Sequence, residues 1–406
     1  MEVSTSQDFA AIGARIEAAM PVLGRHAARV DRENTFPTES VEAVRESGLM
    51  AFFVPREHGG LDGCMVDFAA TAAALGEECP STAMIWAMHC QQVAVLAATP
   101  SAVRAAVLRR IAAAGTLVGS VTTEPGSADL LRVTSSLVAR GDGDLRVTRS
   151  APVVSYGAEA GFFLITMRHP DRPEPVLVLI ERGDGRLETV GGWDALGMRG
   201  TQSVAMRFDV TVPSTRVIGE SFRDVAARTM IPVGHLGWAA LWLGAARGLY
   251  RRTVRRLREL GAQHQRNLAS ESLRAKMAEI RLQLDLLAAL VSTVAIRVDC
   301  LRSRDASIER YREPAFIIQV NNLKVSASRI SFAVADALME VCGLFDGYLR
   351  ASDLGTERVF RDLRSASLMY SNERLLQASG NLLFIGSTSL LNTSTDSETP
   401  AGVRTR

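Results

Sequence analysis

Four consecutive polar residues, Tyr370, Ser371, Asn372 and Glu373, end the stretch RDLRSASLMYSNE, whose middle is small and apolar. A carboxylate or a phenol that a helix places in a pocket can transfer a proton during catalysis. Tyrosine, with a reference pKa of about 10, is protonated and therefore a poor base at neutral pH, whereas a glutamate such as Glu373 is ionised and can accept a proton. On a continuous helix the two residues lie on roughly the same face, one turn apart. Tyr370 is equally well explained as a pocket wall, and Glu373 is better explained as part of a solvated face.

Two histidines are further candidates, because histidine is the side chain most easily tuned near pH 7. His235 precedes the apolar stretch LGWAALWLGAARGLY, whose helical periodicity predicts a bundle helix. A catalytic and a structural role for His235 are equally supported. His89, in the run WAMHCQQVAV, is better explained as a core histidine.

A polar loop supplies possible ligand contacts. The segment GSVTTEPGSADL, residues 119–130, follows a predicted strand and contains consecutive hydroxyls and an acidic Pro-Gly turn. Exposed hydroxyls and backbone N–H groups on such a loop suit a flat hydrogen-bonding ring or a phosphate.

The elements that position these residues fall into three predicted domains and a tail. Residues 1–114 have helical periodicity, with a helix capped by Thr35 and ended by Gly48. Residues 115–228 contain short β-branched runs between Gly-Asp and Pro turns, which predicts an antiparallel β-domain. Residues 229–386 contain four long helical segments, near 233–260, 272–299, 315–345 and 357–385, as a four-helix bundle requires. Residues 387–406 lose this periodicity and predict a flexible tail.

Composition excludes several classes of function. The formal net charge of +2 over 406 residues gives no argument for nucleic acid or an anionic membrane as partner. The apolar stretch at 84–98 is too short to span a bilayer. The five cysteines contain no C-x-x-C pair or histidine spacing for a metal, so we expect free thiols in a reducing cytoplasm and no metal site. The basic run RRTVRRLR at 251–258 is either a solvated face or a contact for an acidic carrier protein or the phosphates of CoA.

Several motifs, in this order and spacing, make the chain resemble the FAD-dependent acyl-CoA dehydrogenase family over roughly residues 5–385. They are VPREHGGLDG at 54–63, LGMRGTQS at 196–203, FDVTVPSTRVIGE at 208–220 and ERVFRD at 357–362. The resemblance implies an N-terminal helical domain, a β-barrel and a C-terminal four-helix bundle, with FAD as cofactor. It also implies a homodimer or homotetramer assembled through the bundle.

The resemblance also implies which residues contact the flavin. They are Val121, Thr122 and Thr123 on one segment and Val153, Val154 and Ser155 on another, with hydroxyl donors at Thr123 and Ser155; Asn372 is a further predicted cofactor contact. The chain lacks the Arg-x-x-Phe pair with which family members contact a neighbouring subunit's flavin, and Arg258 or Arg266 could replace its charge.

The proton-abstracting glutamate of the family is absent. It lies eight residues beyond the Asp of the Arg-Asp pair, and eight residues beyond Asp362 is Tyr370. Some members carry it on the first bundle helix, where this chain has Gly234. Glu373 could replace it, a more acidic substrate could need only Tyr370 or His235, or the chain could catalyse another reaction.

Three functions follow as alternatives. The first is α,β-dehydrogenation of an acyl thioester on CoA or an acyl carrier protein, in biosynthesis, with an unknown electron acceptor. The second is a flavin-dependent monooxygenase, a hydroxylase or N-oxygenase, that uses O2 and reduced flavin from a partner reductase. The third is a flavin-poor binding or scaffold protein.

Overall fold

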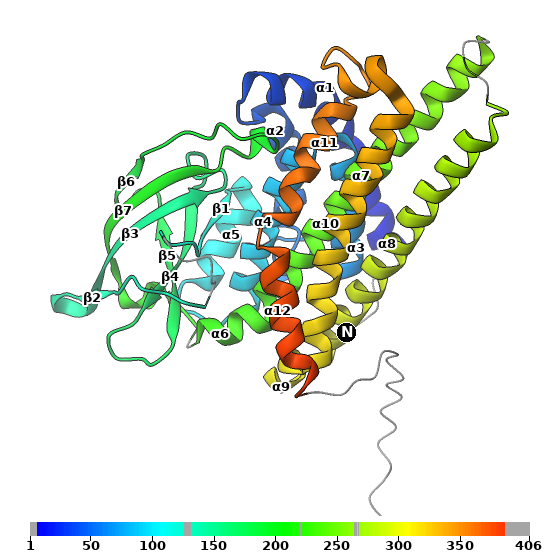
Figure 1. Cartoon of the computed structure of the whole chain (residues 1–406). Coiled ribbons are helices and arrows are strands. Elements are labelled where there is room, and N and C mark those ends of the chain that lie inside the picture. Colours follow the sequence, from blue (N-terminus) through cyan, green and yellow to red (C-terminus); the bar gives the residue numbers. More distant parts are fainter. Residues whose placement is uncertain (1–5, 126–130, 220, 264–265, 267, 386–406) are drawn as a thin grey trace, which may run out of the picture.

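A computed structural model describes residues 6–125, 131–219, 221–263, 266 and 268–385. Helices occupy most of the molecule and the strands gather on one side (Figure 1). The first helices are α1 (Ser6–Glu33), α2 (Thr38–Glu46), α3 (Met65–Glu78), α4 (Pro80–Ala98) and α5 (Arg104–Ala114). The predicted tail at 387–406 lies outside the described residues.

Helix α4 forms the centre of the first helical part. Sixteen of its side chains are buried, including Trp86, His89 and Gln92, so α4 is in contact with protein on all sides. The predicted cap of α2 is wrong. The N-cap position is Pro37 without a side-chain hydrogen bond, and the Thr35 hydroxyl is buried with no partner among the described residues.

In the part of the chain that the structure describes, the β-domain has two four-stranded sheets, ordered β1-β4-β5-β8 and β2-β3-β7-β6. Its strands are β1 (Val118–Val121), β2 (Val138–Ala139), β3 (Asp144–Val154), β4 (Phe162–Arg168), β5 (Pro175–Glu181), β6 (Gly185–Thr189), β7 (Val204–Pro213) and β8 (Val217–Ile218). The prediction of a purely antiparallel domain is wrong, because β1 pairs with β4 in parallel. The chain crosses to the other sheet between these strands, which gives the long connection that parallel neighbours need.

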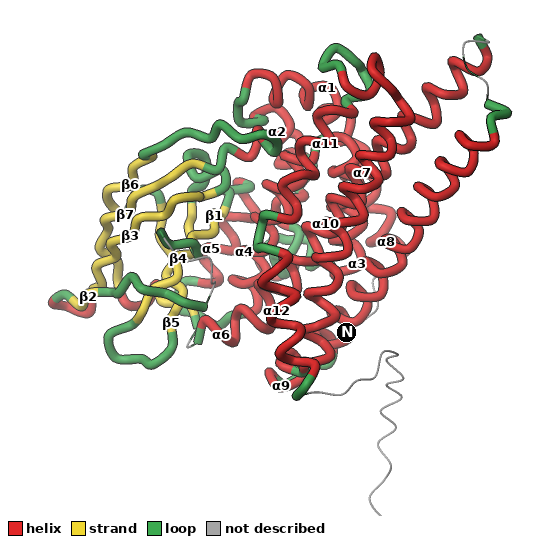
Figure 2. Tube along the Cα trace, viewed as in Figure 1, coloured by secondary structure: helices red, strands yellow, loops and turns green. Residues whose placement is uncertain are grey.

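The bundle is built from α7 (Ile231–Ala262), α8 (Glu271–Ser303), α10 (Pro314–Gly343), α11 (Thr356–Arg364) and α12 (Asn372–Leu383), with short helices α6 (Phe222–Val225) and α9 (Ile308–Arg312) beside it. The prediction of one continuous helix over 357–385 is wrong, because a short 3₁₀ turn and a loop separate α11 from α12 (Figure 2). Tyr370 lies in this break with φ of 50°. Tyr370 and Glu373 therefore do not share a helical face.

Glycines allow α3 of the first part to pack directly on α7 of the bundle. A Cβ on Gly76 would lie 2.4 Å from the Leu241 carbonyl oxygen, and one on Gly244 would lie 2.0 Å from that of Ala73. Larger residues at either position would push the two helices apart. The contact fixes α7, which carries His235, against the first helical part.

Candidate functional site

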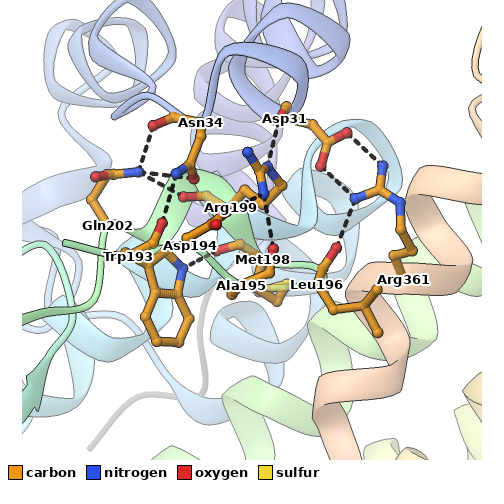
Figure 3. Close-up of polar contacts among 10 residues, drawn as sticks. All are labelled: Asp31, Asn34, Trp193, Asp194, Ala195, Leu196, Met198, Arg199, Gln202 and Arg361. Carbon is orange, nitrogen blue, oxygen red and sulfur yellow. Dashed lines mark hydrogen bonds and ion pairs between the residues drawn. The ribbon is translucent and has the colours of Figure 1, made fainter.

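The loop between β6 and β7 is the place where α1, the β-domain and α11 meet (Figure 3). Arg361 of α11 forms a two-pronged ion pair with the Asp31 carboxylate of α1, at 2.6 and 2.9 Å, and donates to the Leu196 carbonyl at 2.8 Å. From the loop, the Arg199 Nε donates to the Asp31 carbonyl at 2.8 Å. Such bidentate pairs fix orientation as well as contact. Asp31 thus holds both α11 and the loop.

Met198 is the centre of this loop. Its N–H donates to the Asp362 Oδ1 at 2.5 Å, and its carbonyl accepts from the Trp193 Nε1 at 3.1 Å. Asp362 is only 3% exposed, and this burial raises its pKa to about 6. A Cβ on Gly197 would lie 2.2 Å from the Arg361 carbonyl oxygen, so the loop and α11 are in direct backbone contact. Arg361 and Asp362, which belong to the motif ERVFRD, therefore hold this loop against α11.

The two segments predicted to contact a cofactor, residues 121–123 and 153–155, lie side by side. The Thr123 hydroxyl donates to the Val153 carbonyl at 3.2 Å. A bulge between Ala151 and Val154 interrupts the pairing of β3 with β7 just before Ser155, and bulges commonly re-aim side chains. Thr123 is exposed, Val153 is 42% exposed and Ser155 is half-buried. We call these three residues the rim.

The other predicted residues of these segments contribute differently. The Val121 and Val154 side chains are fully buried in the β-domain, and Thr122 is half-buried. Residues 126–130 of the predicted ligand loop lie outside the described residues.

A buried ion pair supports the rim from below. Arg149 donates to the Glu124 carboxylate and, at 2.9 Å, to the Thr123 carbonyl. Burial alone would raise the pKa of Glu124, but hydrogen bonds from Thr134 and Ser135 outweigh it and lower the pKa to about 2. The carboxylate therefore stays ionised and keeps Arg149 in place behind Thr123.

A chain of hydroxyls leads from the rim into the protein. The Ser155 Oγ lies 3.0 Å from the Ser203 Oγ, which lies 2.9 Å from the Thr201 Oγ1, and Thr201 donates to the Met198 carbonyl at 2.8 Å. The Tyr156 N–H donates to the Thr201 carbonyl at 2.8 Å. The rim is thus tied to the loop that α11 holds.

A second polar group lies in the bundle beside Tyr370. The His235 ring lies 5.6 Å, centroid to centroid, from the rings of both Trp238 and Tyr370. The His235 Nδ1 and the indole Nε1 atoms of Trp238 and Trp242 are buried without a hydrogen-bond partner among the described residues. Native proteins rarely leave buried polar atoms unpaired, so each of these three atoms is a candidate contact for a polar ligand or water.

His235 is a neutral histidine in this setting. Burial, and then the charge of Lys324, lowers the pKa of His235 to about 3. Its ring also bonds to the backbone of Val320, which leaves the unpaired Nδ1 as a hydrogen-bond acceptor. His235 can therefore orient a donor group but binds a proton weakly.

Lys324 of α10 holds the break between α11 and α12. The fully buried ammonium donates to the carbonyls of Ala366 and Tyr370, at 3.0 and 2.8 Å, and to the Asn372 Oδ1 at 2.9 Å. Burial lowers its pKa to about 8. The Asn372 amide also donates to the Ser328 Oγ at 2.8 Å, so both ends of this side chain are bonded to α10.

Close to positions 370 and 234 in the sequence, the structure buries no carboxylate that could replace the missing glutamate. A Cβ on Gly234 would lie 2.2 Å from the Gln91 Nε2, and Gln91 donates to the Met230 carbonyl at 2.6 Å, so an amide fills that space. Glu373 is exposed in the first turn of α12.

His89, by contrast, has two backbone partners. Its Nε2 lies 2.8 Å from the Met50 carbonyl, and its Nδ1 accepts from the Val118 N–H at 3.1 Å. Burial lowers its pKa to about 4, so His89 is a neutral core residue. Among the described residues, no group of histidine, cysteine and carboxylate side chains could hold a metal ion, and no helix could cross a membrane.

Two family models match the chain. The acyl-CoA dehydrogenase N-terminal domain matches residues 17–115, and the acyl-CoA dehydrogenase C-terminal domain matches residues 224–370. The chain belongs to the acyl-CoA dehydrogenase family. This confirms the resemblance and the fold class predicted from the sequence, and it makes the protein a flavin oxidoreductase of this superfamily.

Members of the acyl-CoA dehydrogenase family that are similar to this chain differ in reaction. The amino sugar nitrososynthase DnmZ of Streptomyces peucetius is 26% identical over 87% of this chain and 88% of its own. The probable acyl-CoA dehydrogenase YngJ of Bacillus subtilis (strain 168) is 23% identical over 84% of this chain and 87% of its own. The FMN-bound structure of TdsC from Paenibacillus sp. A11-2, a dibenzothiophene monooxygenase, has a TM-score of 0.82 at 22% identity, covering 93% and 97% of the two chains.

The rim fits the flavin that this family assignment supports. A flavin is a flat ring with hydrogen-bonding atoms along one edge, and the rim combines an exposed apolar side chain, Val153, with the hydroxyls of Thr123 and Ser155. Arg149 and the Ser203 hydroxyl hold these residues from behind.

Sequence reasoning missed Lys324 and the supports of the rim. Lys324 has one visible signal, since it is one of two lysines in the chain and lies in an apolar helix. Thr201 and Ser203 belong to the motif LGMRGTQS, and Glu124 to the loop 119–130, but neither motif by itself shows which side chain faces the rim.

Proposed function

We propose that this protein is a flavin-dependent monooxygenase that uses reduced flavin and O2 to oxygenate a small molecule. The observation that carries this proposal is the absence of a glutamate at both family positions, 370 and 234, together with the Gln91 amide that fills the space beside Gly234. Removal of an α-proton from a thioester needs a base, and losing one commonly costs a factor of about 10² to 10⁴ in rate. Oxygen transfer to a nucleophilic atom does not begin with that step.

The residues have distinct proposed roles. A reduced flavin supplies two electrons to O2, so that one oxygen atom is transferred and the other leaves as water. The rim, with the backbone of residues 121–123, holds the ring. The neutral His235 Nδ1 accepts a hydrogen bond from an N–H or O–H of the substrate, and the indole N–H of Trp238 donates one. Tyr370 forms a wall beside His235.

The substrate class follows from these unpaired atoms. A ligand that satisfies the His235 acceptor and the Trp238 donor must carry both donor and acceptor groups, as an amine or a hydroxylated ring does. The similarity to DnmZ and TdsC supports a nitrogen or ring atom as the oxygenated centre.

The test supplies chemically reduced FAD or FMN to the purified protein in air. The substrates are a nucleotide-linked amino sugar, indole and dibenzothiophene, and the readout is oxygenated product by mass spectrometry. We expect one of them to gain an oxygen atom, and expect His235→Ala to reduce that product. The proposal is contradicted if acyl-CoA thioesters reduce the bound flavin without O2 and none of the three substrates gains an oxygen atom in air.

Dehydrogenation of an acyl thioester, on CoA or an acyl carrier protein, is the competing proposal, and the similarity to YngJ favours it. It requires a base, for which Glu373, Tyr370 or His235 are the candidates. Glu373 is exposed in α12 and would have to turn toward the substrate, and burial with the Lys324 charge makes His235 weakly basic. Bleaching of the flavin by an acyl-CoA in the absence of oxygen separates this reaction from the first.

We also propose that two copies of the chain pair through α8. This helix lies at the outer edge of the bundle (Figure 1). Exposed residues recur on it at alternating spacings of four and three, the pattern of a coiled-coil seam: Leu282, Leu286, Ala289, Thr293 and Ile296. Leu282, Leu286 and Ile296 are each at least half exposed, at 50%, 56% and 54%. We propose that a second copy of the chain covers this stripe, because its own α8 has the same spacing.

A further inference from the structure

The hydroxyls of the rim each have one proton to donate. The Thr123 hydroxyl lies 3.2 Å from the Val153 carbonyl, which can only accept, so Thr123 uses its proton inside the β-domain. Toward a bound ligand, Thr123 therefore offers oxygen lone pairs.

The proton of the Ser155 hydroxyl is also directed into the protein, by Ser203 and Thr201. The Thr201 Oγ1 and the Met198 carbonyl oxygen are 2.8 Å apart, a distance at which two oxygens need a proton between them, and only Thr201 has one. Thr201 must then accept from Ser203, at 2.9 Å, and Ser203 must accept from Ser155, at 3.0 Å. The proton of Ser155 thus points into the protein.

The surroundings fix this direction. Ser203 and Thr201 are 5% and 3% exposed, so water does not compete for their protons. The Met198 carbonyl also accepts from the Trp193 Nε1 and the Thr201 N–H, both at 3.1 Å, which aims it at Thr201. Asp362 holds the Met198 N–H from the other side.

We propose that this relay, Ser155 to Ser203 to Thr201 to the Met198 carbonyl, makes the rim an acceptor surface that binds a reduced flavin in preference to an oxidised one. The proposal rests on the proposed reduced-flavin reaction and deepens it. An oxidised flavin ring has a single ring N–H, at N3, and its N5 presents a lone pair. A neutral reduced ring has N–H groups at N1, N3 and N5. Acceptors along its edge therefore match the reduced ring and repel the lone pair of the oxidised one.

The expected preference corresponds to about one hydrogen bond. A net hydrogen bond is worth about 1 kcal/mol, which is roughly a fivefold ratio of dissociation constants. By linkage the same ratio raises the two-electron midpoint potential of the bound flavin by about 20 mV.

The experiment measures the dissociation constants of oxidised and of chemically reduced FAD for the full chain, without oxygen. Ser203→Ala removes the acceptor of Ser155, frees its proton to turn outward, and should lower the preference for reduced FAD about fivefold. Thr201→Val should act in the same direction by releasing the Ser203 proton. Ser40→Ala is the matched control, since Ser40 is a fully buried serine on α2 whose hydroxyl has no partner among the described residues.

A double-mutant cycle shows whether Ser203 acts through Ser155. In a Ser155→Ala background, Ser203→Ala should leave the ratio unchanged, because the hydroxyl that it redirects is gone. The relay is overturned if Ser203→Ala and Thr201→Val give the same ratio as Ser40→Ala, or if Ser203→Ala has its full effect without Ser155.

The binding experiment and the oxygenation test can fail separately. A protein that prefers reduced FAD through this relay but oxygenates no substrate refutes the monooxygenase and leaves the relay intact. A working oxygenase with no redox preference refutes the relay alone.

Discussion

Replacement of Lys324 by methionine should destabilise the protein and loosen the break that carries Tyr370. The buried ammonium is bonded to three oxygens, the carbonyls of Ala366 and Tyr370 and the Oδ1 of Asn372. Methionine has a similar length, fills the same space and donates no hydrogen bond. The substitution therefore removes the hydrogen bonds with little change in packing.

The size of the loss follows from two opposing effects. An acceptor left without its donor costs about 1–3 kcal/mol. The buried Ala366 carbonyl lies at the upper end of this range and the Tyr370 carbonyl and Asn372 Oδ1, in half-buried residues, at the lower end, so the three cost about 5 kcal/mol. Burial of the charge itself lowers the pKa of Lys324 from 10.5 to about 8, so removing the charge recovers about 3 kcal/mol. The net loss in unfolding free energy is then about 2 kcal/mol.

Denaturant unfolding measures this loss as a lower midpoint at an unchanged slope. The control is Lys276→Met, which removes the chain's other lysine, a side chain 40% exposed on α8 in a surface pair with Glu340. That pair should be worth less than about 1 kcal/mol. If the two variants unfold within about 1 kcal/mol of each other, the Lys324 hydrogen bonds do not hold the break.

Three further changes test other parts of the structure by the same unfolding assay or by size. Gly234→Ala should lower the unfolding free energy by about 1–3 kcal/mol, because its Cβ would lie 2.2 Å from the Gln91 Nε2. The control Gly13→Ala, whose Cβ would have nothing within 4 Å, should stabilise α1. Equal changes in the two variants would show that Gln91 moves freely. Burial raises the pKa of Asp362 from 3.8 to about 6, so between about pH 4 and pH 6 the folded state binds more protons than the unfolded state and stability falls as pH rises. Relative to Asp362→Asn, the wild type should lose about 3 kcal/mol of unfolding free energy across this window. Parallel plots of unfolding free energy against pH for the two proteins would contradict the raised pKa. Leu286→Glu should shift the protein to a smaller species in light scattering, since it places charge in the exposed stripe of α8, and an unchanged mass would exclude this helix from the interface.

The sequence predicted those features that depend on local pattern. Helical periodicity located α7, α8 and α10, and β-branched runs between turns located β3, β4, β5 and β6. The parallel pairing of β1 with β4 was missed because strand direction depends on the path of the intervening chain, which runs through the second sheet. The break before α12 was missed for a related reason. The stretch SASLMYS has no proline or glycine, and the alternative to a continuous helix is stabilised by Lys324 from α10, about 46 residues earlier in the chain.

In the candidate site, too, local sequence pattern predicts some features and partners far away in the chain decide the others. Thr123 and Ser155 could be selected as hydroxyls from their motifs, but the direction of their protons depends on partners in other segments, Val153 for one and Ser203 for the other. A hydroxyl can donate or accept, so residue type alone predicted donors to the flavin, whereas the proposed relay makes both hydroxyls acceptors. Ser203 is set by Thr201, and Thr201 by a carbonyl that Asp362 of α11 positions from the bundle. The chemistry of the rim is therefore decided where the β-domain and the bundle meet, and a change at Asp362 that moved Met198 would alter the redox preference of a flavin that it never contacts.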